Sequence, residues 1–190
     1  MSRAKQIVLA TGNPGKLREY RELLEPAGFE IVPFPSEIEE TGATYVANAT
    51  LKAKAALAAT GMRSLGDDSG VEVDALGGFP GLRSARLGPT QQERTAILLE
   101  MLSSVPPPWT ARFTCTIALV EPGKPVRTVE GERRGEIVPE WRGEAGFGYD
   151  PVFLVPEAGR TFGEMSVEEK QRWSHRGAAI KALLETGWLS

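Results

Sequence analysis

A glycine turn near the start of the chain combines a possible phosphate site with a lysine. The segment Thr11-Gly-Asn-Pro-Gly-Lys16 lies between a strand-like run and a helix-like run. The first N–H groups of a helix lack partners within it, so we expect free N–H groups here that favour an anion, with Lys16 adding a full positive charge. The segment is not a Walker loop, because only Asn13 and Pro14 separate its glycines and Leu17 follows the lysine. The alternative interpretation is a simple helix-initiating turn.

Two acidic pairs could hold a metal ion. Glu39-Glu40 precedes a glycine, and Asp67-Asp68 precedes Ser69-Gly70. Magnesium prefers one or two carboxylates, with water and substrate phosphate completing its octahedron. Carboxylates from two separate loops at strand ends would suit it. The alternative is that the glutamates form a solvated pair and that the aspartates form an ordinary turn.

Two further segments contain polar or aromatic groups suited to ligand binding. Phe147-Gly-Tyr-Asp-Pro151 presents an aromatic ring in a glycine loop, where it could stack on a base or belong to the core. Ser174-His-Arg-Gly177 holds the single histidine of the chain, which rules out a two-histidine metal site. Ser174 is a natural helix N-cap. A Cys115–His175 nucleophilic pair is disfavoured, because the cysteine lies in an apolar strand pattern.

The elements that must position these residues follow from hydrophobic periodicity. Helices are predicted at 17–25, 44–60, 90–103 and 174–184. Strands are predicted at 6–10, 29–34 and 71–76, with a short strand at 65–70 that runs into a turn. The β-branched runs 110–120 and 126–138 predict an antiparallel hairpin, because a Pro/Gly-rich turn separates them. Crossovers in the first half and a hairpin in the second half indicate an α/β fold with a mixed sheet.

Composition excludes several classes of protein. The 190 residues are 41% hydrophobic and 25% charged, and the net charge of −3 argues against a DNA or RNA partner. No apolar run approaches the ~18 residues of a membrane span, and we expect no leader peptide. The single cysteine cannot form an internal disulfide, which fits a reducing compartment. We therefore expect one cytoplasmic domain over residues 1–190 with a small anionic ligand.

The order of the motifs is more informative than any one of them. Thr-Gly-Asn-Pro-Gly-Lys, Glu-Glu-Thr-Gly, Asn-Ala-x-x-Lys-Ala, Asp-Asp-Ser-Gly, Gly-Gly-Phe-Pro-Gly, Phe-Gly-Tyr-Asp-Pro and Ser-His-Arg-Gly follow one another along the chain. In this order they resemble the inosine triphosphate pyrophosphatase family, whose members act on non-standard purine nucleoside triphosphates. The resemblance extends from Ile7 to Leu184. It implies a long mixed sheet flanked by helices, two lobes around a central nucleotide-binding cleft, and a homodimer.

The resemblance also implies a role for each matching residue. Asp68 would be the catalytic acid, and Glu39 and Asp68 would bind Mg²⁺. The substrate would be bound by Thr11, Gly12, Asn13, Pro14, Gly15, Lys16, Lys52, Ser69, Phe147, Gly148, Tyr149, Asp150, Lys170, His175 and Arg176. Lys170 and Arg176 can only donate hydrogen bonds, so they would pair with the 6-oxygen of inosine or xanthine and not with the amino group of adenine. Guanine carries the same 6-oxygen, so its rejection must depend on the edge that bears its 2-amino group.

The implied reaction converts ITP, dITP or XTP to the monophosphate and pyrophosphate, which would keep deaminated bases out of DNA and RNA. One departure from the family pattern is Ala47, where a glutamate is common. Glu39, Glu40, Asp67 and Asp68 remain, so we expect activity to be retained. The rival hypotheses are a nucleotide-binding regulatory module, a pyrophosphatase for modified pyrimidines, and a structural domain with solvated acidic turns.

Overall fold

One mixed β-sheet is the centre of the fold in residues 5–35 and 38–190, which the computed structural model describes. Within these residues, seven strands lie in the order β2-β1-β3-β4-β5-β6-β7. β1 is parallel to β2 and β3, whereas β6 is antiparallel to β5 and β7, so the predicted mixed α/β sheet is confirmed. The strands are β1 Lys5–Ala10, β2 Phe29–Phe34, β3 Ser64–Val73, β4 Trp109–Val120, β5 Arg127–Ile137, β6 Phe153–Val155 and β7 Arg160–Thr161.

The helices are α1 Pro14–Leu24, α2 Tyr45–Thr60, α3 Gln91–Leu102, α4 Val167–Trp173 and α5 His175–Glu185. Thr44 and Thr90 cap the N-termini of α2 and α3, and Gly61 closes α2 in the left-handed conformation, as helix-end chemistry favours. Hydrophobic periodicity did not predict the short α4, which begins at a Ser166–Glu169 capping box. Of the described helices, none is long and apolar enough to cross a membrane.

The chain divides into two compact units, and neither is continuous in sequence. The first unit consists of Met1–Asp68, Cys115–Gly131 and Arg176–Ser190. The second consists of Ser69–Thr114 and Glu132–His175. Strands β3, β4 and β5 each contribute residues to both units.

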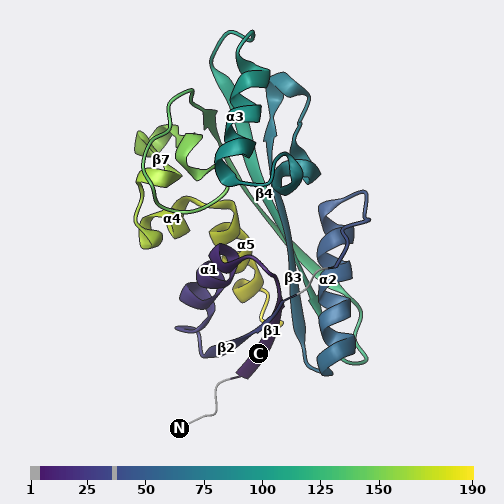
Figure 1. The fold of residues 1–190 in the computed structure, drawn as a ribbon. Coiled ribbons are helices and arrows are strands. Elements are labelled where there is room, and N and C mark those ends of the chain that lie inside the picture. The colour runs from purple at the N-terminus through teal and green to yellow at the C-terminus, as the bar shows by residue number, and fades with distance from the viewer. Residues whose placement is uncertain (1–4, 36–37) are drawn as a thin grey trace. The chain divides into compact units, whose positions relative to one another are not determined.

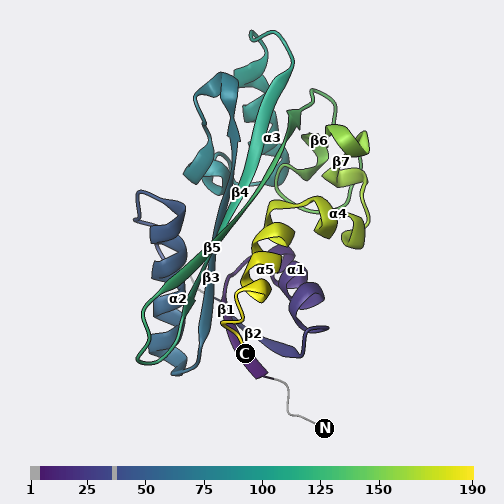
Figure 2. The same cartoon turned by 180° about the vertical axis from the view of Figure 1, so that it is seen from behind.

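In the first unit, helices cover both faces of the sheet (Figures 1 and 2). α1 and α5 lie side by side on one face, and α2 lies on the other. β1 explains this arrangement, because successive side chains of a strand point to opposite faces. Ile7 and Leu9 pack with α1 and α5, whereas Val8 and Ala10 pack with Ala56 of α2. The last four side chains of β1 are fully buried, which is the pattern of a parallel strand covered on both faces.

α2 approaches β3 very closely at Gly66. A Cβ at this position would lie 2.0 Å from the carbonyl oxygen of Ala49 and 2.7 Å from the backbone nitrogen of Ala53. Only glycine therefore allows the helix backbone to lie this close to the strand. Asn48 and Lys52 are one helical turn apart, so both lie on the face of α2 that packs against β3, and both contact Asp68.

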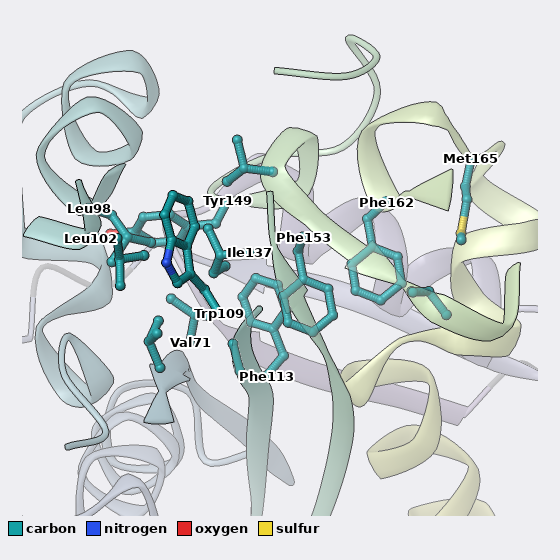
Figure 3. Packing of buried hydrophobic residues seen from close by; sticks show 14 residues of the cluster. Val71, Leu98, Leu102, Trp109, Phe113, Ile137, Tyr149, Phe153, Phe162 and Met165 are labelled. Carbon is teal, nitrogen blue, oxygen red and sulfur yellow. The ribbon is translucent and has the colours of Figure 1, made fainter. Parts of the chain in front are cut away.

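The second unit has its own aromatic core (Figure 3). The Phe113 and Phe153 ring centroids are 4.6 Å apart, and Phe162 stacks on Phe153 at 5.3 Å. Trp109 belongs to the same cluster and donates its indole N–H to the Val105 carbonyl at 2.8 Å. This satisfied polar atom lets a large ring be buried at little cost.

The predicted turn after a short strand at 65–70 was wrong. β3 runs without interruption from Ser64 to Val73 through the Asp-Asp-Ser-Gly segment. These residue types favour turns when they are solvated. Here both aspartates are buried and have charged or polar partners on each face of the sheet, so tertiary contacts override the local preference.

Candidate functional site

Asp67 and Asp68 of β3 point to opposite faces of the sheet in the first unit. This follows from strand geometry, because consecutive side chains alternate between faces. Asp67 faces the side covered by α1 and α5, where it accepts hydrogen bonds from Tyr20 and Arg176. Asp68 faces the side covered by α2, where it contacts Asn48 and Lys52. Two identical neighbouring residues therefore occupy two different environments.

Asp67 is the centre of a buried ion-pair network. Its carboxylate accepts from Arg176 Nε at 2.8 Å, from the Tyr20 hydroxyl at 2.9 Å and from Lys16 Nζ. Cys115 Sγ lies 3.3 Å away, and Arg176 also donates to Glu19 at 2.5 Å. Arg176 is only 1% exposed. The network therefore ties α1 and α5 to β3 through charge-assisted hydrogen bonds.

The charges of this network keep Asp67 ionised. Burial alone would raise the pKa of Asp67, but the Arg176 and Lys16 charges hold it well below its usual value. Burial and the Asp67 charge raise the pKa of both Tyr20 and Cys115, so these two groups stay protonated. Because donors surround both of its oxygens, Asp67 is poorly suited to bind a metal ion.

Asp68 lies in a cluster of different character. Its Oδ2 accepts from Asn48 Nδ2 at 3.0 Å, and its Oδ1 lies 3.4 Å from Lys52 Nζ. The same lysine donates to Glu40 Oε1 at 2.7 Å. Burial raises the pKa of Asp68 more than the Lys52 charge lowers it. A carboxylate with a raised pKa is suited to accept a proton near neutral pH.

The two glutamates of the acidic pair differ in position. Glu40 is partly buried and shares Lys52 with Asp68. Glu39 is exposed, and its backbone carbonyl accepts from the Thr41 N–H at 3.1 Å. Ala47 lies against the same loop, since a Cβ on Gly42 would be 2.7 Å from the Ala47 side chain. Of the two, Glu40 is therefore the one that the structure brings to Asp68.

The glycine turn at the start of α1 is closed by its own side chains. Asn13 caps the helix, and its Oδ1 accepts from the N–H groups of Gly15 at 2.8 Å and Lys16 at 3.2 Å. The Asn13 N–H itself donates to Thr11 Oγ1 at 3.1 Å. The expectation of free N–H groups was therefore wrong for these three, because the Asn13 side chain accepts from two of them and the Thr11 hydroxyl accepts from the third. The positive end of the α1 dipole and the Lys16 side chain are still the groups of this turn that can attract an anion.

In the second unit, the Phe147 loop is organised around Asp150. The Asp150 Oδ2 accepts from the Phe147 N–H at 2.7 Å and from Lys170 Nζ at 2.6 Å. The Lys170 ammonium also lies 4.5 Å from the centre of the Phe147 ring, a cation–π contact. Gly146 has φ of +76°, and a Cβ there would lie 2.0 Å from Asp150 Oδ2. The loop therefore holds an aromatic ring and an ammonium group in fixed positions.

The remaining residues assigned to the substrate differ in exposure. Tyr149 is a core residue of the second unit, and its hydroxyl donates to the Ser84 carbonyl at 2.8 Å. Burial raises the pKa of Tyr149 to about 12. His175 is buried and stacks on Phe113 with ring centroids 4.6 Å apart. Ser69 is partly buried on β3, and Gly12, Pro14 and Gly148 have at least partly exposed surfaces.

The contribution of Asn48 was not predicted from the sequence. This fully buried residue bonds to both Asp68 and the backbone of the acidic loop. A usable signal was present, because Asn48 and Lys52 are four residues apart on one predicted helix and must share a face. Glu19 was not predicted either, since no local pattern shows that a helix glutamate pairs with Arg176, 157 residues away.

Comparison with known proteins shows which family of sequences the chain is similar to. The Ham1 family profile matches residues 7–186. The chain is 51% identical over 180 residues to the dITP/XTP pyrophosphatase of Gloeobacter violaceus, covering 94% of this chain and 92% of that protein. It is 48% identical over 192 residues to a dITP/XTP pyrophosphatase of Thermus thermophilus, covering 97% and 93%.

Solved structures of HAM1 and dITP/XTP pyrophosphatase proteins are also similar to this chain. A HAM1 protein from Coxiella burnetii superposes with a TM-score of 0.83 at 41% identity, covering 94% of this chain and 96% of that chain. A dITP/XTP pyrophosphatase from Mycobacterium abscessus superposes with a TM-score of 0.72 at 39% identity, covering 94% and 97%. These matches confirm the family resemblance found in the motifs. The chain therefore belongs to the Ham1 family.

Proposed function

We propose that the protein hydrolyses dITP, XTP and ITP to the monophosphate and pyrophosphate. Relatives at about half identity over nearly the whole chain are dITP/XTP pyrophosphatases, which supports this substrate class. The observation that carries the proposal is the buried Asp68 carboxylate beside Lys52, which also contacts Glu40. It combines a proton acceptor, a cation and a second carboxylate in one cluster.

The residues around Asp68 fit a magnesium ion. Among the described residues, no group of three or more His, Cys, Asp or Glu side chains could hold a metal. Magnesium does not need one, because it takes one or two carboxylates and completes its shell with water and phosphate oxygens. Asp68 and Glu40 already share the Lys52 ammonium, so they can face a common cation. We propose these two as ligands, with Glu39 as an alternative to Glu40. Bound there, Mg²⁺ would neutralise phosphate charge.

The proposed reaction is an in-line displacement at the α-phosphorus. Asp68 accepts a proton from the attacking water, the new P–O bond forms, and the bond to the bridging oxygen of the β-phosphate breaks. The pyrophosphate leaves with the bond's electron pair. Lys16 and Lys52 supply positive charge to the phosphate oxygens, which is the main protein contribution in phosphoryl transfer. The reaction forms no covalent intermediate with the protein.

Base recognition is proposed for the second unit. Phe147 provides a ring face for stacking, which contributes roughly 1–3 kcal/mol per base. Lys170 can donate to a 6-oxygen while Asp150 holds its ammonium in place. His175 completes the proposed set in this unit. Arg176 was also assigned to the base, but it belongs to the first unit, where it lies 1% exposed between Asp67 and Glu19. This engagement favours a structural part for Arg176 beside any contact with the base.

The product analysis that tests the proposal uses the purified protein with Mg²⁺ and separate samples of ITP, dITP, XTP, ATP and GTP. We expect monophosphate and pyrophosphate, with the highest rates for the first three. Diphosphate with inorganic phosphate would contradict the cleavage position. Nucleotide binding without any product would favour the regulatory module.

Asp68→Asn tests the catalytic assignment. We expect its kcat to fall by about 10²–10⁴-fold, the usual contribution of a general base, while nucleotide binding is largely retained. The exposed Asp74→Asn, in the second unit, is the matched control with the same chemical change. An Asp68→Asn enzyme with near-normal turnover would exclude the proposed role.

We also propose a homodimer in the cytoplasm. Homodimers are the commonest symmetric assemblies of soluble proteins, and the family resemblance implies one. Sedimentation equilibrium should give twice the mass of the chain. A monomer across micromolar concentrations would contradict the dimer.

A further inference from the structure

The Asn48 side chain bridges two parts of the Asp68 cluster. Asn48 is in the first turn of α2 and is fully buried. Its Oδ1 accepts from the Gly42 N–H at 2.8 Å, and its Nδ2 donates to Asp68 Oδ2 at 3.0 Å. One amide thus links the loop that carries Glu39 and Glu40 to the carboxylate on β3.

The chemistry of these partners determines which way the amide points. The Gly42 N–H can only donate, so the atom facing it must be the amide oxygen. The amide nitrogen must then face Asp68, and Oδ2 of that carboxylate must accept. The other oxygen, Oδ1, lies on the side of Lys52. Asn48 therefore fixes the plane of the Asp68 carboxylate, with one oxygen held by the amide and the other on the side of Lys52.

Close packing keeps this bridge in place. A Cβ on Gly42 would lie 2.6 Å from Asn48 Oδ1, so the loop backbone lies directly against the amide. On the other side, the absence of a Cβ at Gly66 lets α2 rest on β3 at Ala49, the next residue along the helix. The amide is thus held by the loop, the helix and the strand together.

We propose that Asn48 is a positioning residue for the hydrolysis, which orients the Asp68 carboxylate and fixes the Glu39–Gly42 loop beside it. This inference rests on the proposed function. Asn48 does not need to touch the substrate. It acts by keeping Oδ1 of Asp68 on the side of Lys52. Misplacement of a catalytic group by about 1 Å can cost roughly 10²-fold in rate.

Two variants separate the two hydrogen bonds. Asn48→Leu has nearly the same size and removes both. Asn48→Asp keeps an oxygen for the Gly42 N–H but, when ionised, cannot donate to Asp68 and places a second negative charge beside it. The control is Ser64→Ala, which removes a buried hydroxyl that donates to the Met62 carbonyl at the start of the same strand. Circular dichroism identifies the folded variants, and Asn48→Asp carries the test if Asn48→Leu does not fold.

Steady-state kinetics with dITP at saturating Mg²⁺ give the main readout. We expect kcat to fall about 10²-fold in both Asn48 variants, with KM within about 3-fold of wild type, whereas Ser64→Ala keeps both values. A folded Asn48 variant with kcat within about 2-fold of wild type would overturn the inference. So would a loss confined to KM, since that would mean that Asn48 supports only substrate binding.

Hydrogen exchange of the Gly42 amide gives a readout that does not depend on activity. We expect protection to fall at least 10-fold in Asn48→Leu and to be retained in Asn48→Asp. Unchanged protection in Asn48→Leu would overturn the proposed link to the loop. A wild-type protein that hydrolyses none of the nucleotides would contradict the proposed function instead, while the exchange result would still test the bridge.

Discussion

Replacement of Asp67 by asparagine should destabilise the protein severely. Asparagine has the same shape but no charge, so Arg176 and Lys16 lose the carboxylate that both contact. Removing one partner of a buried ion pair costs about 3–5 kcal/mol. For a chain of this length, that corresponds to a fall of about 6–20 °C in the thermal midpoint. Denaturant unfolding and calorimetry at pH 7 measure both quantities.

A control variant makes this prediction specific. The control is Glu132→Gln, which removes exposed ion pairs with Arg112 and Arg134 at 3.0 and 3.1 Å. It should cost less than about 1 kcal/mol, as exposed pairs do. A cost below about 1 kcal/mol for Asp67→Asn would refute the interpretation of the network as a structural charge cluster.

The effect should also depend on pH in a defined direction. The pKa of folded Asp67 is depressed below the usual value of 3.8, so its stabilisation is fully present above that value. The stabilisation is lost as pH falls through the depressed folded pKa. The stability gap between wild type and Asp67→Asn should therefore be constant above pH ~5 and shrink toward pH 2. A gap that widens on acidification would contradict the sign of the shift.

Three other predictions concern the same unit. Gly66→Ala should push α2 away from β3 and lower both soluble yield and kcat, because its Cβ would meet the helix backbone at 2.0 Å; a variant with wild-type kcat and thermal midpoint would show that the contact is not required. Cys115 should react with a thiol reagent at pH 8 only as fast as the protein unfolds, since burial raises its thiol pKa; rapid modification of folded protein would exclude this. Lys52→Gln should shift the acidic limb of kcat/KM to higher pH, since Lys52 lowers a pKa of Asp68 that burial has raised; an unmoved limb in an active variant would count against Asp68 as the base.

Much of the fold could be predicted because its strongest patterns are local. The helices at 45–60 and 91–102 have clear caps, and the strands at 5–10 and 29–34 are short apolar runs between glycine or proline signals. Elements of two or three residues, such as β6 and β7, contain too few side chains for a period to appear. The path of β3 through Asp-Asp-Ser-Gly could not be predicted either, since it depends on partners from both faces of the sheet.

Part of the candidate site could also be predicted from local motifs, and part of it depends on contacts between distant residues. Lys16, Lys52 and Asp68 could be named from motifs that resemble a known family, and they lie in one unit. The different roles of Asp67 and Asp68 could not be named, because they follow from strand pairing and not from residue type. The partners of Asp67 lie 47, 51 and 109 residues away, and no sequence period reaches that far.

The separation between Asp67 and Arg176 has a consequence for biosynthesis. The chain is made from its N-terminus at about 5–20 residues per second, so the 109 residues between the two take about 5–20 s to add. During that time the nascent chain has β1, β2 and β3 but not the arginine whose charge offsets a buried carboxylate. The first unit can therefore reach its final ionic state only late in translation. A ribosome stalled before residue 176 should hold this region in a loosely packed, protease-sensitive form.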